Sequence, residues 1–173
     1  MLVTISGLPG SGTSTVARLV AAELGLSHLD GGTIFRHLAT DAGMTLAEFG
    51  AWAERHAAVD IELDRRLAAR AKQGDVVLES RLAGWIAHNE GLDGLRVWLT
   101  CDEQVRAGRV GRRDRLTPEE ALEVNRVREA SEHARYQSAY GIDIDDLSPY
   151  DLVLDSAAHG PDELAATIID RAR

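Results

Sequence analysis

The sequence predicts an α/β protein with a five-stranded parallel sheet flanked by helices. Three observations predict this class. Short apolar segments alternate with helical patterns, a glycine-rich turn joins the first apolar segment to the first helix, and 173 residues suit one compact domain. The apolar segments are nearly continuous and partly β-branched, which is typical of buried parallel strands. We expect core strands at Leu2–Ser6, Asp75–Glu79, Leu95–Thr100 and Leu152–Asp155, with an edge strand at Ser27–Leu29.

Helical signals lie between these strands. Apolar residues recur every three or four positions from Val16 to Leu24, and Gly25 is suited to end that helix. A threonine followed three residues later by glutamate is a capping box, and it predicts helix starts at Thr45 and Thr117. Helices are therefore expected over 16–24, from Thr45 through Arg55, over Val59–Ala71, from Thr117 to about Tyr140, and from about Pro161 onward.

Two helical segments interrupt the alternation of strands and helices. The first insertion spans residues 34–73 and the second spans about 106–140, which leaves a core of residues 1–33, 74–105 and 141–173. Parallel sheets bind ligands at the carboxyl ends of their strands, where both insertions would emerge. We therefore expect the insertions to cover a ligand site within a single domain.

The composition limits the classes of function. The formal net charge is −9, and Lys72 is the only lysine among the basic residues. An acidic chain repels polyanions, so nucleic-acid binding is not expected. No apolar stretch approaches the length of a membrane span, and the N-terminus has no secretory pattern. Because Cys101 is the single cysteine, we expect a cytoplasmic protein with no disulfide within the chain and no membrane partner.

The segment GLPGSGTST carries the most specific chemical signal. It stands between a strand and a helix, which is the setting of a phosphate-binding loop with the pattern G-x-x-x-x-G-K-[ST]. The glycines allow backbone N–H groups to turn toward phosphate oxygens, and the N-terminus of the next helix adds partial positive charge. The residues expected to bind ATP phosphates are Gly7, Leu8, Pro9, Gly10, Ser11, Gly12, Thr13, Ser14 and Thr15.

One position departs from this pattern, because Thr13 stands where the lysine is expected. A lysine would supply a point charge, and unit charges about 4 Å apart interact by roughly 4 kcal/mol at an effective dielectric near 20. Arginines elsewhere in the chain are therefore expected to supply positive charge. Ser14 is placed to bind Mg²⁺ through its hydroxyl, and Glu79, at a strand end, could orient magnesium-bound water. The alternative for Glu79 is an ion pair with Arg81.

Arginines gather in two parts of the sequence. Arg36 follows the edge strand and Arg81 follows a core strand, so both should face the crevice at the strand ends. A larger group lies in the second insertion: Arg106, Arg109, Arg112, Arg113, Arg115, Arg126, Arg128 and Arg135. Glutamates stand among these arginines, so charge counting alone favours a solvated, salt-bridged helix face. If both groups reach the crevice, they would hold two phosphorylated molecules.

The motifs taken together resemble a known family, the compact archaeal-type cytidylate kinases. The segments that carry the resemblance are SGLPGSGTST, GGTIFR, GMTLAEF, ELDRR, VVLESRLAGW and RYQSAYGIDIDDLSPYDLVLDS, which cover nearly the whole chain. The resemblance implies a P-loop nucleoside monophosphate kinase fold, with a monophosphate-binding insert at 34–73 and a small lid with its following helix at 106–140. It implies transfer of the γ-phosphoryl group of ATP, with Mg²⁺, to CMP or dCMP. Members of this family can carry threonine in place of the loop lysine.

The resemblance also implies roles for individual side chains. Arg36 and Arg81 match positions that hold the monophosphate, and Asp30 lies on the same side. Catalytic arginines of the lid and its following helix are expected at Arg112, Arg113, Arg128 and Arg135. Three residues of the first insertion could pair with the edges of cytosine, or could form an ion-pair ladder on a helix surface: Asp60, Asp64 and Arg65.

Two alternatives remain open from the residues alone. A P-loop kinase could act on another monophosphate, UMP or AMP, or on a small metabolite alcohol such as shikimate, in which case Asp30 would be the candidate base. A nucleotide-binding switch could have kept the loop and lost turnover with the lysine, but it gives no reason for two groups of arginines. We expect a monomer whose partners are ATP and CMP or dCMP.

Overall fold

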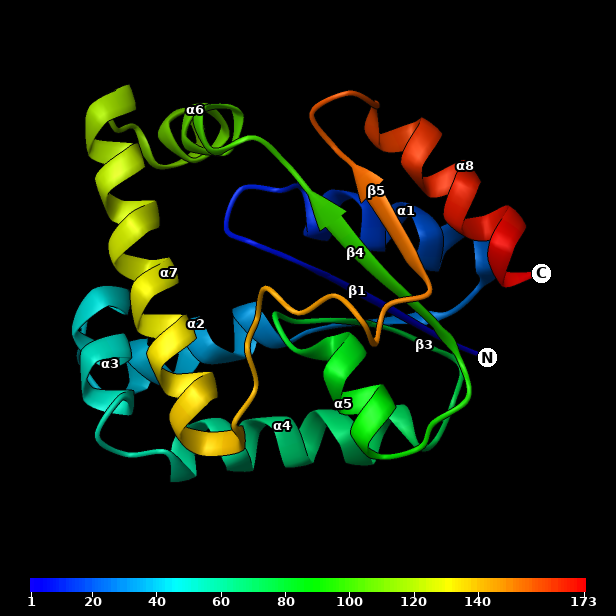
Figure 1. Ribbon diagram of the computed structural model, residues 1–173, viewed down its shortest axis with the longest axis horizontal. Helices are drawn as coiled ribbons and strands as arrows, with labels where there is room; N and C mark the ends of the chain where they lie inside the picture. Colours follow the sequence, from blue (N-terminus) through cyan, green and yellow to red (C-terminus); the bar gives the residue numbers. More distant parts are fainter.

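The computed structural model describes residues 1–173 and shows a parallel sheet covered on both faces (Figure 1). Its strands are β1 (Leu2–Gly7), β2 (Ser27–Asp30), β3 (Val76–Glu79), β4 (Leu95–Thr100) and β5 (Leu152–Asp155). They lie in the order β2-β3-β1-β4-β5, and each neighbouring pair is parallel. The predicted fold class is confirmed, including the edge strand.

Eight helices complete the fold. They are α1 (Thr13–Leu24), α2 (Gly31–Asp41), α3 (Leu46–Ala53), α4 (Ala58–Ala71), α5 (Ala83–Asn89), α6 (Glu103–Asp114), α7 (Pro118–Tyr140) and α8 (Pro161–Ala172). Both predicted capping boxes are present, at the starts of α3 and α7. None of the helices combines the length and the hydropathy needed to cross a lipid bilayer.

Helices α2 and α5 were not predicted from the sequence. The glycines at the start of α2 have low helix propensity, so the sequence does not indicate that a helix begins there. Asp30 caps this helix by accepting a hydrogen bond from the Thr33 amide at 2.9 Å. Helix α5 is only seven residues long and has no side-chain cap. Both helices are therefore fixed by packing on the sheet more than by local sequence signals.

Two apolar clusters explain how the helices cover the sheet. Successive side chains of a strand point to opposite faces, so Val77 lies in one cluster while Val76 and Leu78 lie in the other. Helices α1 and α8 cover the face of Val77, and α4 and α5 cover the opposite face. Helices therefore bury both faces of the sheet.

A close contact accounts for two distinctive sequence motifs, RLAGW and DIDDLSPYDL. A Cβ atom on Gly84 of α5 would lie 2.2 Å from the ring of Tyr150, so only glycine fits there. The Tyr150 ring also packs against the Trp98 ring, with 5.2 Å between ring centroids. Two segments far apart in sequence are thus fastened together beneath the sheet.

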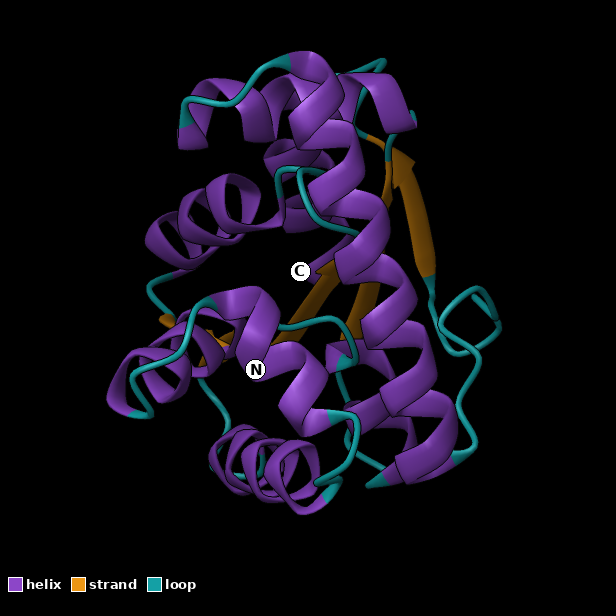
Figure 2. Ribbon diagram, turned by 90° about the vertical axis from the view of Figure 1, so that its left-hand side faces the viewer, coloured by secondary structure: helices purple, strands orange, loops and turns teal.

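The long helix α7 connects the two insertions in space. It packs against α6 of the second insertion and against α3 and α4 of the first. Figure 2 views the molecule from the side on which α7 lies and shows it running along that whole side. Because of this position, one helix can present side chains toward the carboxyl ends of the strands.

Candidate active site

A cavity of about 550 Å³ lies at the carboxyl ends of β1 and β3. It is bordered by residues of the glycine-rich loop 7–15, by the start of α2, by α4, and by α6 and α7. Its volume falls within the usual range for small-molecule sites. Only six of its 28 lining residues are hydrophobic, so a charged ligand suits it better than an apolar one.

The glycine-rich loop offers backbone donors to this cavity. Gly12 precedes α1 with a φ of 89°, a conformation that favours glycine, and no side chain caps the helix. The amides of Thr13 and Ser14 donate to no backbone carbonyl. These N–H groups and the positive end of α1 form the kind of site that binds anions.

Not every residue of the loop reaches the cavity. Leu8, Pro9, Gly10, Gly12, Thr13, Ser14 and Thr15 line it, together with Arg18 of α1, which the sequence analysis did not single out. Gly7 and Ser11 lie behind it. The Gly7 carbonyl accepts a hydrogen bond from Arg81 at 2.8 Å, and the Ser11 carbonyl accepts one from Ser156 at 2.7 Å. These two residues hold the shape of the loop.

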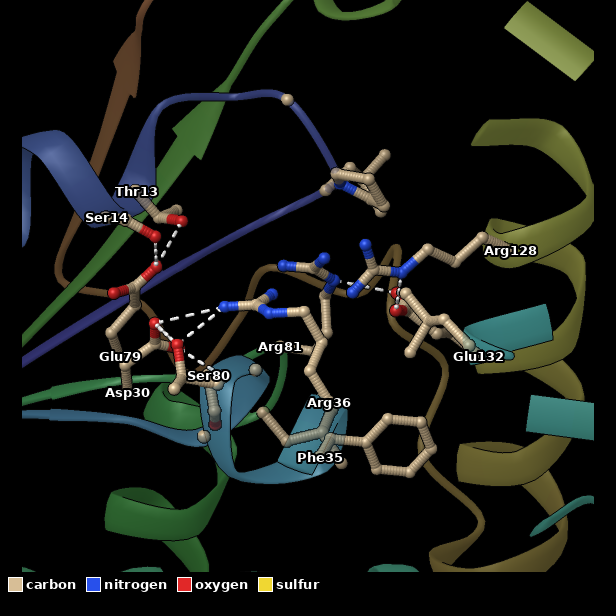
Figure 3. A pocket seen from close by; sticks show the side chains of 18 of the residues that line it. Thr13, Ser14, Asp30, Phe35, Arg36, Glu79, Ser80, Arg81, Arg128 and Glu132 are labelled. Carbon is tan, nitrogen blue, oxygen red and sulfur yellow. Dashed lines mark hydrogen bonds and ion pairs between the residues drawn. The ribbon is translucent and has the colours of Figure 1, made fainter. Parts of the chain in front are cut away.

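Glu79 is held at the end of β3 by three side chains. The hydroxyls of Thr13 and Ser14 donate to its Oε1 atom at 2.7 and 2.6 Å, and His28 Nε2 lies 2.9 Å from its Oε2 atom (Figure 3 shows the two hydroxyl contacts). The alternative ion pair with Arg81 is not formed. A serine hydroxyl beside a carboxylate is a set of hard oxygen ligands, which fits the preference of Mg²⁺.

Thr13 therefore has a role in place of the expected lysine. Its side chain is buried, and its hydroxyl contributes to the position of Glu79 without adding charge. The loop itself contributes no cationic side chain to the phosphate-binding end of the cavity.

Two arginines on the opposite side share one buried glutamate. Arg81 donates from Nε to Glu132 Oε2 at 2.7 Å, and Arg128 donates from Nε to Glu132 Oε1 at 2.9 Å. Burial alone would raise the pKa of Glu132, but the charges of Arg81 and Arg128 outweigh it and hold that pKa below its ordinary value. Glu132 is thus an ionised counter-charge that fixes both guanidinium groups.

A third arginine enters the same space from α2. Arg36 donates to Thr33 Oγ1 at 2.6 Å and lies 3.5 Å from Asp30 Oδ2. Figure 3 shows Arg36, Arg81 and Arg128 directed into the region between Glu79 and Glu132. The arginines predicted from separate parts of the sequence therefore meet in one cavity.

Arg113 and Arg135 border the cavity in different ways. Arg113 is 59% exposed and donates to the adjacent Asp114 at 2.7 Å. Arg135 is buried, with its Nε atom 3.2 Å from Asp60 Oδ2 and its guanidinium 4.7 Å from the centre of the Phe35 ring. Arg113 is thus an exposed side chain paired with a neighbouring carboxylate, whereas Arg135 is buried.

Carboxyl groups from α4 form a further side of the cavity. Asp60 and Asp64 both line it, and Asp64 Oδ2 accepts a hydrogen bond from the Tyr140 hydroxyl at 2.7 Å. Burial raises the pKa of Asp64 to about 7, although the hydrogen bond from Tyr140 acts in the opposite direction. Burial also raises the pKa of Asp60, while Arg135 opposes the increase. Asp64 is therefore a carboxyl group that can exchange a proton near neutral pH.

Two of the site residues expected in the insertions lie outside the cavity. Arg65 is 70% exposed and pairs with Glu62 on the same face of α4, as the ion-pair alternative proposed. Arg112 is exposed on α6 and is not among the lining residues. Their spacing in the sequence does not reveal that Arg65 and Arg112 face away from the cavity. Their direct neighbours Asp64 and Arg113 line it.

Three further arginines of the second insertion serve the fold. Arg106 is buried, donates to the Pro9 carbonyl at 3.2 Å and pairs with Glu129 of α7. Arg109 donates to the Ser156 carbonyl at 2.6 Å, and Arg126 pairs with Glu103 on the surface. The solvated, salt-bridged interpretation thus holds for Arg126, whereas Arg106 and Arg109 hold parts of the fold together from less exposed positions.

Sequence reasoning missed several residues of the site. They are His28, Thr33, Asp114, Glu132, Tyr136 and Tyr140, which line the cavity or hold the residues that do. One signal was available on α7: Arg128, Glu132 and Arg135 recur at helical spacing and so share one face. No local pattern marks the others, because their partners are distant in the sequence.

The fold and the arginine-lined cavity define a P-loop kinase. Residues 2–158 match the model of the cytidylate kinase-like family, and the chain belongs to that family. It is 48% identical to the cytidylate kinase of Halobacterium salinarum, covering 98% of this chain and 88% of that one. It is 47% identical to the cytidylate kinase of Methanococcus vannielii, covering 92% of each. Membership of a kinase family removes the non-catalytic switch as an interpretation.

Solved structures of low sequence identity share the fold. An uncharacterised protein from Eubacterium ventriosum superposes with a TM-score of 0.74 at 16% identity, covering 99% of this chain and 97% of that one. Shikimate kinase from Acinetobacter baumannii superposes with a TM-score of 0.61 at 15% identity, covering 98% and 91%. At these identities the likeness concerns the architecture alone.

Proposed function

We propose that the protein transfers the γ-phosphoryl group of ATP to CMP or dCMP, with ADP and CDP or dCDP as products. The observation that carries this proposal is the meeting of Arg36, Arg81 and Arg128 opposite the glycine-rich loop. One side of the cavity suits a nucleotide triphosphate and the other suits a second phosphate. The names of the relatives, cytidylate kinases, favour a cytidine nucleotide as the acceptor.

The loop side is proposed to bind ATP. The free amides at the start of α1 would donate hydrogen bonds to the phosphate oxygens, and Ser14 and Glu79 would hold Mg²⁺, Glu79 through water. When bound, Mg²⁺ neutralises charge on the phosphates. The Thr13 hydroxyl donates to the same Glu79 oxygen as Ser14 and so helps to keep that carboxylate beside the Ser14 hydroxyl.

The arginine side is proposed to bind the acceptor phosphate. Arg81 and Arg128 share one glutamate, so the three groups together carry a net positive charge. That charge would attract a phosphate dianion. Their guanidinium groups are already ordered, so little side-chain entropy remains to be lost on binding. Arg36, on α2, adds a third cation that must leave Asp30 and Thr33 to reach the phosphate.

Catalysis is proposed to depend on position and charge, without a general base. The acceptor phosphate is already anionic, and its oxygen attacks the γ-phosphorus in line while the bond to the ADP oxygen breaks. Arg113 and Arg128 would neutralise negative charge on the transferring phosphoryl group. Arg135, paired with Asp60, would stabilise the neighbouring side of the cavity. We infer that residues 34–73 act as the monophosphate-binding insert and 106–140 as the lid, which excludes water as it closes.

The base is proposed to lie against the α4 carboxyl groups. A protonated Asp64 can donate to N3 of cytosine while its other oxygen accepts from the 4-amino group, although Tyr140 competes for one oxygen. Asp60 supplies a second acceptor nearby, paired to Arg135. Arg65 has no part in this proposal because it points to solvent.

A kinase for a small alcohol is less well supported by the geometry. That reaction would use Asp30 as the base, but the oxygens of Asp30 already accept from the Thr33 amide and hydroxyl and lie near Arg36. The carboxylate is therefore occupied as a helix cap.

The test is ADP release from Mg-ATP by the purified protein with CMP, dCMP, UMP, AMP, GMP and shikimate as acceptors. We expect turnover with CMP and dCMP well above that with the other acceptors. Comparable turnover with UMP or AMP would overturn the assigned base, and turnover with shikimate alone would overturn the monophosphate site. Sedimentation of the same sample would test the expected monomer.

A further inference from the structure

His28 makes a contact that the proposed reaction does not yet explain. It lies on the edge strand β2, its Nε2 atom is 2.9 Å from Glu79 Oε2, and the two side chains are 19% and 6% exposed. No pattern in the sequence distinguishes this histidine from the five others. Its partner is 51 residues away in the chain.

The sheet register directs His28 and Glu79 to the same place. In the β2–β3 ladder His28 stands opposite Val77, and Asp30 stands opposite Glu79. Side chains two residues apart on a strand share a face, so His28 and Glu79 both belong to the face of Val77. That is the face covered by α1, whose first residues include Thr13 and Ser14.

The contacts on Glu79 divide between its two oxygens. Oε1 accepts from both hydroxyls of the loop, and Oε2 faces His28. A carboxylate can only accept hydrogen bonds, so His28 must present Nε2 as an N–H donor. The two sets of donors, from α1 and from β2, fix the plane of the carboxylate.

We propose that His28 is a positioning residue that orients Glu79 toward Ser14 and thereby sets the response of nucleotide binding to Mg²⁺. This inference rests on the proposed function, because it takes the loop side of the cavity as the site of Mg-ATP. The loop has no lysine, and Thr13 and His28 would together hold Glu79 in position. They hold the carboxylate through hydroxyl and imidazole donors, which leave it directed toward magnesium-bound water.

The experiment compares His28→Phe, which keeps a ring without an N–H, with His28→Gln, which can still donate. His37→Phe is the matched control, because His37 is exposed on α2. ATP affinity is measured by calorimetry in EDTA and again over a series of Mg²⁺ concentrations, with circular dichroism to establish folding. His28→Leu replaces His28→Phe if the larger ring prevents folding.

We expect His28→Phe to bind ATP in EDTA like the wild type and to need about tenfold more Mg²⁺ for the same gain in affinity. His28→Gln should recover most of that response, and His37→Phe should match the wild type. An unchanged Mg²⁺ response in His28→Phe, or an equal loss of ATP binding with and without Mg²⁺, would overturn the inference.

The two proposals fail in different ways. If the wild type released no ADP with CMP yet showed the expected Mg²⁺ responses, the acceptor assignment would be wrong and the role of His28 would stand. If the wild type phosphorylated CMP and His28→Phe kept the wild-type Mg²⁺ response, only the role of His28 would be lost.

Discussion

The two sides of the cavity handle phosphate charge in different ways. The loop side offers backbone amides and hydroxyls around the carboxylate of Glu79, with threonine where a lysine is expected. The α7 side presents Arg128 with Arg81 beside it, both bound to the buried Glu132. The positive charge that is held in place by ion pairs therefore lies on the side that we assign to the acceptor phosphate.

The α7 side is also the more demanding part to build. Removing a carboxylate from water is unfavourable, and Glu132 is compensated only because two guanidinium groups satisfy both of its oxygens. The loop side needs no such compensation, since its donors are mostly main-chain groups. Substitutions on the two sides should therefore differ in kind, with stability affected on one and catalysis on the other.

The largest effect is expected from Glu132→Gln. Two partly buried guanidinium groups would lose the counter-charge of the buried Glu132, so the free energy of unfolding at pH 7 should fall by about 3–5 kcal/mol. The lowered pKa of Glu132 means that its contribution is present above the ordinary value of 4.5 and is lost as the pH falls through the folded-state pKa. Urea unfolding measures the free energy of unfolding of both proteins at pH 7 and pH 3. The difference in that free energy between variant and wild type should be smaller at pH 3. An equal difference at both pH values would contradict the account.

The next effect concerns Asp64, which faces α7 through Tyr140. Its pKa is raised from 3.8 to about 7, so the folded state binds more protons and stability falls as the pH rises between those values. Asp64→Asn keeps an acceptor for Tyr140 and removes this penalty. Relative to the wild type, the variant should gain at most roughly 4 kcal/mol in unfolding free energy between pH 4 and pH 8. Parallel pH profiles for the two proteins would show that the carboxyl is not perturbed.

A smaller effect is expected from restoring the lysine. Thr13→Lys places a cation beside Glu79 in a buried position, where it would pair with that carboxylate and displace it from Ser14. We expect kcat to fall about tenfold, with little change in KM for CMP. Thr13→Ser, which keeps the hydroxyl, is the control. A rise in kcat for Thr13→Lys would show that the loop side lacks a charge it needs.

The smallest effect is expected from Arg65→Ala. Its guanidinium pairs with Glu62 in solvent, where water and salt screen the two charges, so little stability should be lost. The KM values for CMP and ATP should remain unchanged. A rise in KM for CMP would bring Arg65 back to the base-binding side as the sequence first suggested.

Local patterns were sufficient to predict the framework and the loop. The strands, the capping boxes and the glycine-rich turn are each written in a few adjacent residues, such as Thr117 and Glu120. The missed residues depend on contacts across the fold. Glu132 meets Arg81 over 51 residues, and His28 meets Glu79 over the same separation, through the register of β2 and β3. Charge spread around α7 also concealed which of its arginines would face the cavity.

The most direct test of the account is calorimetric titration of CMP and of cytidine into the wild type and Arg81→Ala. CMP should bind the wild type about 100-fold more tightly than cytidine does, because charge-assisted hydrogen bonds to phosphate contribute about 1.5–3 kcal/mol each. In Arg81→Ala that ratio should fall to about 10 or less, while the affinity for cytidine stays the same. Arg81→Lys would show whether a point charge at this position recovers part of the ratio. Equal affinity of the wild type for CMP and cytidine, or a ratio unaffected by Arg81→Ala, would contradict the assignment of the arginine side to the acceptor phosphate.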